Sequence, residues 1–427
     1  MYLKTTRRLM AAALAGAMAL QSGAAFAQEK TLKVLLFGMP STIGLQALAG
    51  DFEKETGIKA DIEIIGQDVF ENRITLSFAG RTGDIDVVHT PAIQVQRWVE
   101  AGWINPITDQ VDALEDKDDF LKGPLEAYAV EGDTYALPFF AEVGLLAYRK
   151  DILEAKGQQP PKTWDEMLSV AAAINTPETA AIALRAAPGQ GFNMFVFPAL
   201  MWAYGGKFFA DYPSDLTPAI NSPENLKALQ VYIELLTKYG PQGVGRFNFP
   251  EIVAAVQGGQ VAMTVDGTSI TSQLVDKEKS PVADNIELAL PPSGPAGRFP
   301  PIAVHGLAVP SDAKDPEASF KFIQWATSKE TMAKIALNQA YPDFTRASVA
   351  SIPEVVEKYS GIQPNFLDLR VEALNEARGD YRPLISTWPE IGAALGENIN
   401  GALNGLVTPE AALEKADQEV SDIIDSQ

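Results

Sequence analysis

The sequence predicts an α/β protein in which helices cover a largely parallel β-sheet. Apolar runs of strand length alternate with helical periodicity between residues 32 and 88, which is the pattern of successive βαβ units. The chain has 427 residues, enough for about two domains. It is 46% hydrophobic and 21% charged, which is the composition of a globular protein.

The first 27 residues have the features of a secretory signal peptide. Lys4, Arg7 and Arg8 precede an apolar run over 9–20, and an Ala-Phe-Ala triplet ends at residue 27. The run is shorter than the ~20 residues that span a membrane. We therefore expect export to the periplasm and a mature chain that begins near Gln28. The paired arginines leave open the general and the twin-arginine export routes.

The composition excludes several chemistries. The chain has no cysteine, which excludes disulfides, thiolate metal sites and a lipid anchor on cysteine. Acidic residues outnumber basic ones 55 to 34, so the surface should repel nucleic acid. His89 and His305 have no other metal-binding residue at ligand spacing, and we expect neither a metal site nor a cofactor.

Three short strands define the first part of the fold. The apolar segments 32–37, 60–65 and 85–88 are predicted strands, and helices with apolar residues at 45–52 and 70–78 separate them. In such sheets, ligands bind beyond the carboxyl ends of the strands. The loops 38–42, 66–68 and 89–94 are therefore candidate parts of a binding site.

The rest of the chain alternates in the same way. Thr163 and Glu166 have the spacing of a capping box at a helix start. Helices are expected over 221–238, 250–258 and 315–338, strands over 261–265 and 302–310, and a Pro/Gly linker over 291–297. The acidic cluster at 115–119 is predicted to be a solvated turn.

Six segments in order resemble one family. They are AGWINP at 101–106, YALP at 135–138 with LAYRKDI at 146–152, PKTWDE at 161–166, QGGQVAM at 257–263, GLAVP at 306–310, and the helix 318–329. Together they resemble the family 1 extracellular solute-binding proteins, which are periplasmic receptors of carbohydrate ABC importers related to the maltose-binding type.

The resemblance implies a periplasmic binding protein type II fold, with two α/β lobes joined by a hinge and a ligand cleft between them. The N-terminal lobe would comprise 28–138 and 304–342, and the C-terminal lobe 143–300 and 346–427. Hinge segments would lie near 138–142, 301–306 and 341–346. It further implies a monomer that is not an enzyme and that passes a small carbohydrate or polyol to membrane permease subunits.

Candidate ligand-binding residues lie in the predicted loops, the hinge segments and the second lobe. They are Ser41, Gln67, Asp68, His89, Thr90, Gln94, Phe139, Glu142, Arg185, Gln190, Asn193, Trp202, Asp266, Thr268, His305, Asp343, Arg346 and Trp388. Carbohydrate recognition uses aromatic faces and planar polar groups, and this set provides both. Arg185 and Asp266 are expected to face solvent in the open form and to clamp adjacent hydroxyl groups. The glycine-rich segment 185–193 could instead be a plain surface turn.

One departure from the family bears on the ligand. Maltose-type members have a stacking tryptophan two residues after the glycine that follows the Ala-Met strand, where this chain has Ser269. That difference favours a smaller, more polar solute than a maltodextrin. Two alternatives remain open at this point: a secreted carbohydrate-active enzyme, and a receptor for a solute that is not a sugar.

The signal peptide gives the first testable prediction. Secreted protein should begin at or very near Gln28, because the small residues before it form the cleavage site. N-terminal sequencing of the exported product checks this. Protein that retains Met1 and remains in the cytoplasm would contradict it.

Overall fold

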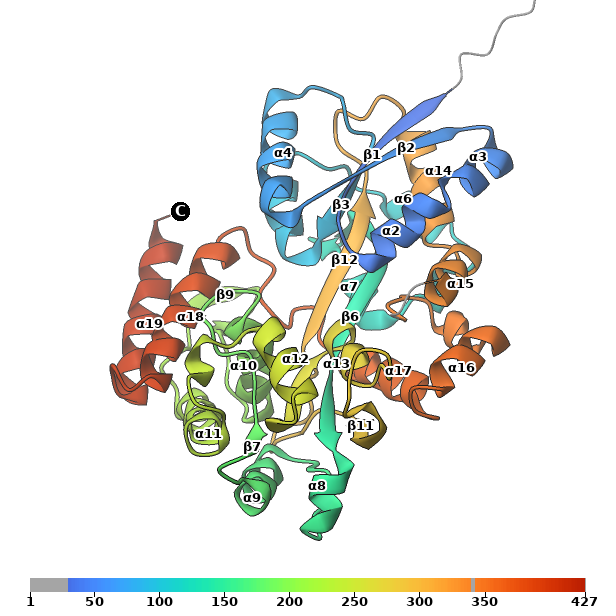
Figure 1. Ribbon diagram of the computed structural model, residues 1–427. Coiled ribbons are helices and arrows are strands. Elements are labelled where there is room, and N and C mark those ends of the chain that lie inside the picture. Colours follow the sequence, from blue (N-terminus) through green and yellow to red (C-terminus); the bar gives the residue numbers. More distant parts are fainter. Residues whose placement is uncertain (1–29, 339–341, 427) are drawn as a thin grey trace, which may run out of the picture.

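The computed structural model describes residues 30–338 and 342–426, so the predicted signal peptide lies outside the described residues. Two α/β lobes share one continuous arrangement of strands, in the order β2-β1-β3-β12-β6-β10-β7, with β11 also paired to β6. Figure 1 shows one lobe above and the other below, with β6 and β12 running between them. In the described chain, no helix combines the length and the apolar character needed to cross a membrane.

The N-terminal lobe is built on three parallel strands. β1 (Thr31–Phe37) pairs with β2 (Lys59–Ile65) over its full length and with β3 (Val87–Pro91). Helices pack against these strands: α2 (Pro40–Ala47), α3 (Ala49–Thr56) and α4 (Gln67–Gly80). The three predicted strands and the helix predicted around 70–78 are thus confirmed to within a few residues. The helix predicted around 45–52 is instead two helices, α2 and α3, separated at Leu48.

Strand β6 (Ala136–Arg149) belongs to both lobes. Its first half pairs antiparallel with β12 (Ile302–Ala308), and its second half pairs with β10 (Val261–Gly267) and β11 (Ile286–Ala289). β12 is also antiparallel to β3, so the centre of the arrangement is mixed. The predicted parallel sheet therefore holds for each lobe's outer strands and not for the strands that join the lobes.

The C-terminal lobe surrounds β10 and its parallel neighbour β7 (Ala180–Ile182). Helices enclose this short sheet: α9 (Trp164–Ile174), α10 (Asn193–Ala203), α11 (Pro223–Tyr239), α12 (Phe249–Gln257), α13 (Thr268–Leu274), α18 (Trp388–Leu403) and α19 (Pro409–Asp425). Smaller elements complete both lobes: α5 (Val95–Glu100), α6 (Thr108–Asp112), α7 (Lys122–Glu126), β4 (Ala129–Val130), β5 (Asp133–Thr134), α8 (Lys150–Ala155), β8 (Phe209–Asp211) and β9 (Asp215–Pro218).

The helix predicted over 315–338 is two helices, α14 (Pro316–Ala326) and α15 (Lys329–Asn338). Ser328 begins the second one, because its hydroxyl accepts a hydrogen bond from the Thr331 backbone N–H. Side-chain caps of this kind compete with helix continuation, and the apolar periodicity does not reveal them.

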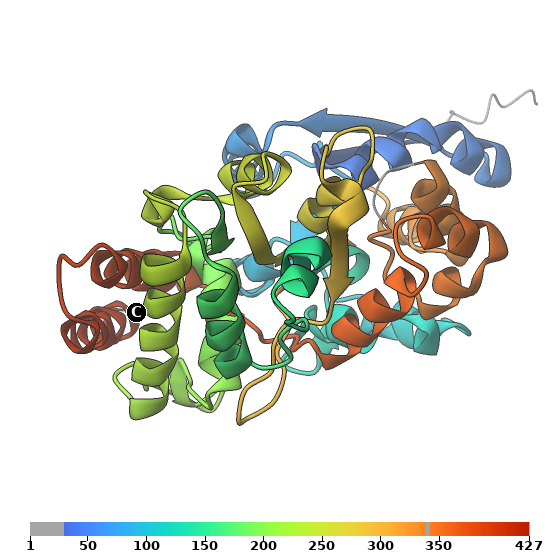
Figure 2. The same cartoon turned by 60° about the horizontal axis from the view of Figure 1, so that its bottom comes forward.

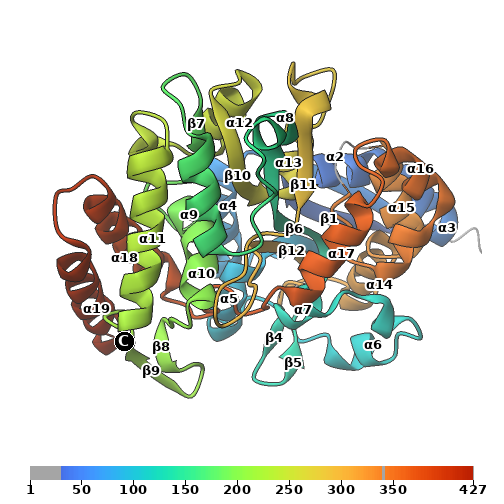
Figure 3. The ribbon, with the colours of Figure 1, turned by 90° about the horizontal axis from the view of Figure 1, so that it is seen from below.

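Two helices of the tail differ from the expected lobe assignment. α16 (Pro353–Ser360) packs against α15, and α17 (Phe366–Glu376) packs against α7 and β6. In Figures 2 and 3 these orange helices lie beside the N-terminal lobe, opposite the red helices α18 and α19. Only the chain after α17 returns to the C-terminal lobe, so the assignment of all of 346–427 to that lobe is wrong.

The crossing strands approach each other closely at Gly144. A Cβ atom there would lie 2.5 Å from Cδ of Pro301, a distance that real Cβ atoms essentially never show. The Gly144 N–H also donates to the Pro301 carbonyl at 2.7 Å. A side chain at this position would therefore push strand β6 away from the segment at Pro301.

Gly144→Ala should destabilise the protein by about 1–3 kcal/mol, the usual cost of an overpacked core site. Urea unfolding of the variant beside the wild type measures this. Gly50→Ala is the matched control, because it adds the same methyl group in helix α3 with nothing within 4 Å. Equal stability of the two variants would contradict the close approach.

Candidate functional site

Polar side chains from both lobes meet where β6 passes between them. Arg185 follows β7, and its Nε and Nη2 donate to the Asp266 carboxylate at 3.1 and 2.6 Å. Its Nη1 donates to the Gly191 carbonyl at 2.8 Å, and the guanidinium lies 4.3 Å from the centre of the Phe195 ring. Both members of the ion pair are buried in this conformation. The expectation that they face solvent concerns the open form and stays a prediction.

Thr268 connects this pair to the hinge segments. It is the first residue of α13, two positions after Asp266. Its hydroxyl donates to Oδ1 of Asp343 at 3.2 Å and accepts from the Val143 N–H at 3.4 Å. The Ala141 N–H donates to the Asp343 carbonyl at 2.9 Å, which joins the hinge segments near 138–142 and 341–346 directly.

Glu142 lies between the ion pair and Asp343. It pairs with Ala303 in the β6–β12 register, and its Oε2 is the atom that a Cβ on Gly267 would meet, at 3.0 Å. Burial raises its pKa, the negative charge of Asp266 adds to this, and Ser269 and Arg185 oppose it. Burial and the charge of Glu142 raise the pKa of Asp343 to about 7. These two carboxylates therefore retain a proton more readily than exposed acids do.

A buried histidine pair lies on the N-terminal side of this cluster. His89 Nε2 is 2.9 Å from His305 Nδ1, so one ring donates to the other. Phe37 stacks on His89 and Phe140 stacks on His305, at centroid distances of 4.0 and 4.5 Å. Burial lowers the pKa of His89 well below its usual value, and burial with the charge of Arg382 lowers that of His305 to about 3. The lowered pKa values favour the neutral form of both rings, and a hydrogen bond between imidazoles needs an unprotonated nitrogen on at least one of them.

The described residues do not favour a metal ion. None of their His, Asp and Glu side chains gather in groups of three or more that could hold one. The two histidines contact each other, and protein metal sites need three or four ligands.

The enclosed spaces near the cluster are small. Ser41, Phe139, Phe140 and Asp343 border a cavity of about 10 Å³. His305 and Arg382 border another of about 50 Å³. Pockets for small-molecule ligands usually measure ~300–1,000 Å³, so neither cavity is large enough to hold a sugar or a polyol. A groove of about 540 Å³ between α7 and the β8–β9 hairpin contains none of the predicted site residues.

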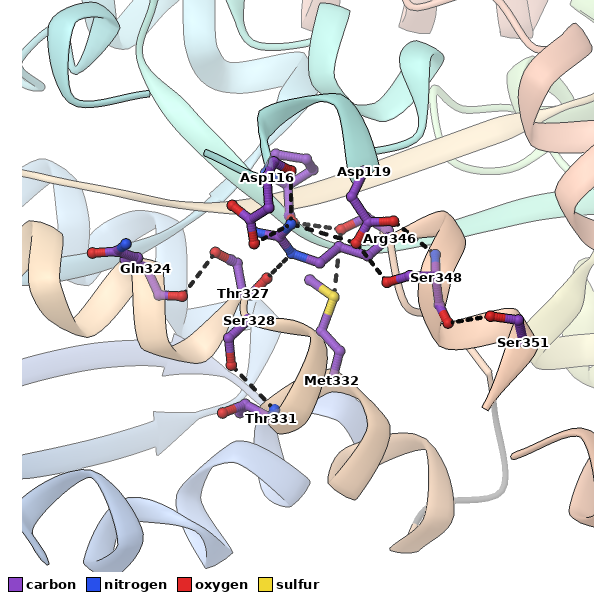
Figure 4. Close-up of polar contacts among 12 residues, drawn as sticks. Asp116, Asp119, Gln324, Thr327, Ser328, Thr331, Met332, Arg346, Ser348 and Ser351 are labelled. Carbon is purple, nitrogen blue, oxygen red and sulfur yellow. Dashed lines mark hydrogen bonds and ion pairs between the residues drawn. The ribbon is translucent and has the colours of Figure 1, made fainter. Parts of the chain in front are cut away.

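Arg346 is not part of this cluster. Figure 4 shows it enclosed by the 116–119 loop and the junction of α14 and α15. Its Nη1 lies 2.9 Å from Oδ2 of Asp116 and 3.5 Å from Oδ2 of Asp119, and its Nε donates to the Thr327 carbonyl. This corrects the expectation for Arg346, which is a structural residue. The acidic cluster is a turn with Glu115, Asp116 and Asp118 exposed, as predicted, although Asp116 and Asp119 also pair with Arg346.

Two more candidates are used inside the C-terminal lobe. Asn193 accepts from the Gly189 N–H at 3.1 Å and donates to the Gly396 carbonyl at 2.8 Å, so it fixes the glycine-rich loop to α18. Trp388 is 0% exposed and meets Phe208 edge to face, which leaves no ring face free for a sugar. Both residues therefore support the lobe rather than offer contacts.

Trp202 is half-buried at the lobe surface. Its Nε1 donates to the Tyr381 carbonyl at 3.0 Å, and the Arg378 guanidinium covers one ring face at 4.2 Å. It borders a cavity of about 230 Å³ that none of the cluster residues lines. The structure thus separates Trp202 from the interlobe cluster.

The remaining candidates lie at the predicted loops. Thr90 and Gln94 are buried at the end of β3, and the Gln190 carbonyl accepts from Nη1 of Arg382 at 2.9 Å. Gln67 and Asp68 begin α4, but their side chains lie outside the described part of the chain.

Sequence reasoning did not identify two buried arginines. Arg370 donates through Nη2 to the carbonyls of Ala141 and Phe344, at 3.0 and 2.8 Å. Arg382 donates to the Ile302 carbonyl at 3.2 Å as well as to Gln190. Arg370 lies within an ordinary amphipathic helix and Arg382 in an irregular loop, so neither had a pattern that marks a buried charge.

Comparison with known families and structures agrees with this arrangement. Residues 40–333 match the model of the bacterial extracellular solute-binding proteins. A mannitol-binding protein of Pseudomonas aeruginosa is 28% identical, over 92% of this chain and 92% of its own length. An erythritol/L-threitol-binding protein of Mycolicibacterium smegmatis is 24% identical, over 76% of this chain and 72% of its own.

Solved structures give the same result. An ABC transporter solute-binding protein of Agrobacterium vitis with bound D-mannitol is 28% identical, with a TM-score of 0.76 over 93% of this chain and 99% of its own. One from Agrobacterium radiobacter in complex with ribitol is 27% identical, with a TM-score of 0.79 over 92% and 98%. The fold is that of type II periplasmic binding proteins, and the chain belongs to the bacterial extracellular solute-binding protein family.

Proposed function

We propose that this protein captures a small polyol or sugar between its lobes and delivers it to the permease of an ABC importer. One observation supports this above the others: Glu142, Arg185, Asp266, Thr268 and Asp343 converge where the chain crosses between lobes. Carboxylates and a guanidinium fork suit paired hydroxyl groups, which accept and donate together. Relatives of nearly full-length coverage bind mannitol and ribitol, which supports an acyclic polyol.

The ligand is proposed to be small. Ser269 stands beside Glu142, where a bulky aromatic platform for an extended sugar chain would otherwise project. The described core also places Trp388 and Trp202 away from the cluster. A polyol of four to six carbons, bound mainly through its hydroxyl groups, suits such a polar site better than a maltodextrin.

Closure of the lobes is proposed to accompany binding. Hinge motion would act on the segments near 138–142, 301–306 and 341–346, where the crossing chains are hydrogen-bonded to one another. We also propose that the protein works outside the cytoplasm after removal of its signal peptide, as a binding protein rather than an enzyme.

D-Mannitol or ribitol should raise the melting temperature and reduce the radius of gyration. A ligand that binds only the folded state stabilises it by RT ln(1 + [L]/Kd), about 2.7 kcal/mol at 100-fold saturation. Thermal unfolding and solution scattering with and without each polyol measure the two effects. Mannitol recovered unchanged from the mixture distinguishes binding from catalysis, and maltotriose is the comparison ligand. Tighter binding of maltotriose than of both polyols would contradict the proposal.

Arg185→Met should abolish or strongly weaken polyol binding and also destabilise the fold. Losing one partner leaves Asp266 buried and uncompensated, at a cost of about 3–5 kcal/mol. Calorimetric titration and urea unfolding measure the two effects separately.

Arg346→Met is the matched control, since Arg346 is also a buried arginine with carboxylate partners and an aromatic neighbour. It should lower stability by less than Arg185→Met, because Asp116 and Asp119 are partly exposed, while the Kd for mannitol stays within about threefold of wild type. If Arg185→Met binds mannitol with wild-type affinity, Arg185 is not part of the binding site.

A further inference from the structure

We propose that Asp343 and Arg370 form a hinge unit that positions Glu142 and makes the closing of the lobes depend on pH. The proposal rests on the proposed function, because Glu142 belongs to the proposed solute site. It concerns the regulation of that site rather than the identity of the solute.

The guanidinium of Arg370 links the hinge segment near 138–142 to the hinge segment near 341–346. Nη2 of Arg370 donates to the carbonyl of Ala141, next to Glu142, and to the carbonyl of Phe344, next to Asp343. The Arg370 guanidinium also lies 4.5 Å from the centre of the Phe344 ring. Helix α17 thereby fixes the positions of the segments that carry Glu142 and Asp343 relative to each other. Without the Arg370 contacts, both segments would lose this support.

The C-terminal lobe contacts the unit through one hydroxyl. Thr268 donates to Asp343 at 3.2 Å, and the first turn of α13 that contains Thr268 belongs to that lobe. Rotation of the lobe away from the hinge separates these two residues and admits water to the carboxylates. The environment of the pair is therefore tied to the conformation of the lobes.

Charges of both signs face the two carboxylates. Glu142 is faced by Arg185 from the segment after β7 and by Asp266 from β10. Asp343 is faced by Glu142 from β6, by Arg370 from α17 and by the Tyr359 hydroxyl from α16. Nε and Nη1 of Arg370 are buried and have no hydrogen-bond partner among the described residues. Arg370 therefore offsets the negative charge of Glu142 and Asp343 only in part.

The direction of the pH effect follows from burial. With the lobes in this arrangement, burial and the charge of Glu142 raise the pKa of Asp343 to about 7. Hydration on opening returns the pKa toward the ordinary value, so the closed arrangement binds a proton more tightly. Low pH therefore favours closure, and solute affinity should decrease as pH rises through about 7.

The test compares wild type with Asp343→Asn, which keeps an oxygen to accept from Thr268 and removes the titrating group. Calorimetric titration with D-mannitol at about pH 5.5 and about pH 8.5 measures the affinity. One proton changes a Kd by at most about tenfold per pH unit. Wild type should bind several-fold more weakly at the higher pH, whereas Asp343→Asn should bind with nearly the same Kd at both. The same change of Kd with pH in wild type and in Asp343→Asn would overturn the proposal.

A second measurement needs no solute. An acid with a raised pKa in the folded state loses stability as pH rises from about 4 to about 7 and not beyond, because the unfolded chain releases its proton first. The melting temperature of wild type should therefore fall more between about pH 5 and about pH 8 than that of Asp343→Asn. Parallel profiles would overturn the hinge unit whatever the solute is.

Asp119→Asn is the matched control, because Asp119 is a partly buried carboxylate beside Arg346 and away from the hinge unit. Its pH profiles should follow those of wild type. If mannitol binds neither protein while the melting profiles of wild type and Asp343→Asn diverge as stated, the hinge unit is supported and only the polyol assignment fails.

Discussion

The strand β6 is the constraint on which both lobes depend, because it is part of the sheet of each lobe. Its first half continues the N-terminal sheet through β12, and its second half continues the C-terminal sheet through β10 and β11. The middle of this strand is thus where the chain passes from one lobe to the other. Glu142 lies in that middle, so a polar side chain there is presented to both lobes at once.

A second constraint is the cost of burying charge at this point. Glu142, Asp266 and Asp343 are buried together with Arg185 and Arg370, and isolated charges in such a place would cost several kcal/mol each. The structure compensates by bonding Arg185 directly to Asp266 and by directing Arg370 at backbone carbonyls. Burial explains why the two carboxylates outside the direct ion pair, those of Glu142 and Asp343, have raised pKa values.

The strands and most helices were predictable from the sequence, because their apolar periodicity reports which face is buried. The mixed order of the central strands was not predictable in this way, since periodicity does not give strand direction. The helix break at Ser328 was missed because a single hydroxyl cap decides it against a continuous apolar pattern. Lobe membership of α16 and α17 depends on contacts between distant segments, which no local signal contains.

The candidate site was predictable in part. Loops after parallel strands and the crossing segments brought Glu142, Asp266 and Asp343 into the set. Whether an arginine faces the cleft or the core depends on its partners: Arg185 and Arg346 look alike in the sequence, yet one contacts Asp266 and the other contacts Asp116. Residue type indicates which chemistry is available, whereas the three-dimensional contacts decide which residues are free to perform it.

Helix α17 has a mechanical consequence for the direction of opening. It packs on α7 of the N-terminal lobe, while Gln363 just before it exchanges two hydrogen bonds with the Leu288 backbone of the other lobe. Glu376 at its end also pairs with Arg298. Helix α17 and the residue Gln363 before it thus connect the two lobes along this edge. An opening motion that keeps these bonds would separate the lobes mainly along the opposite edge.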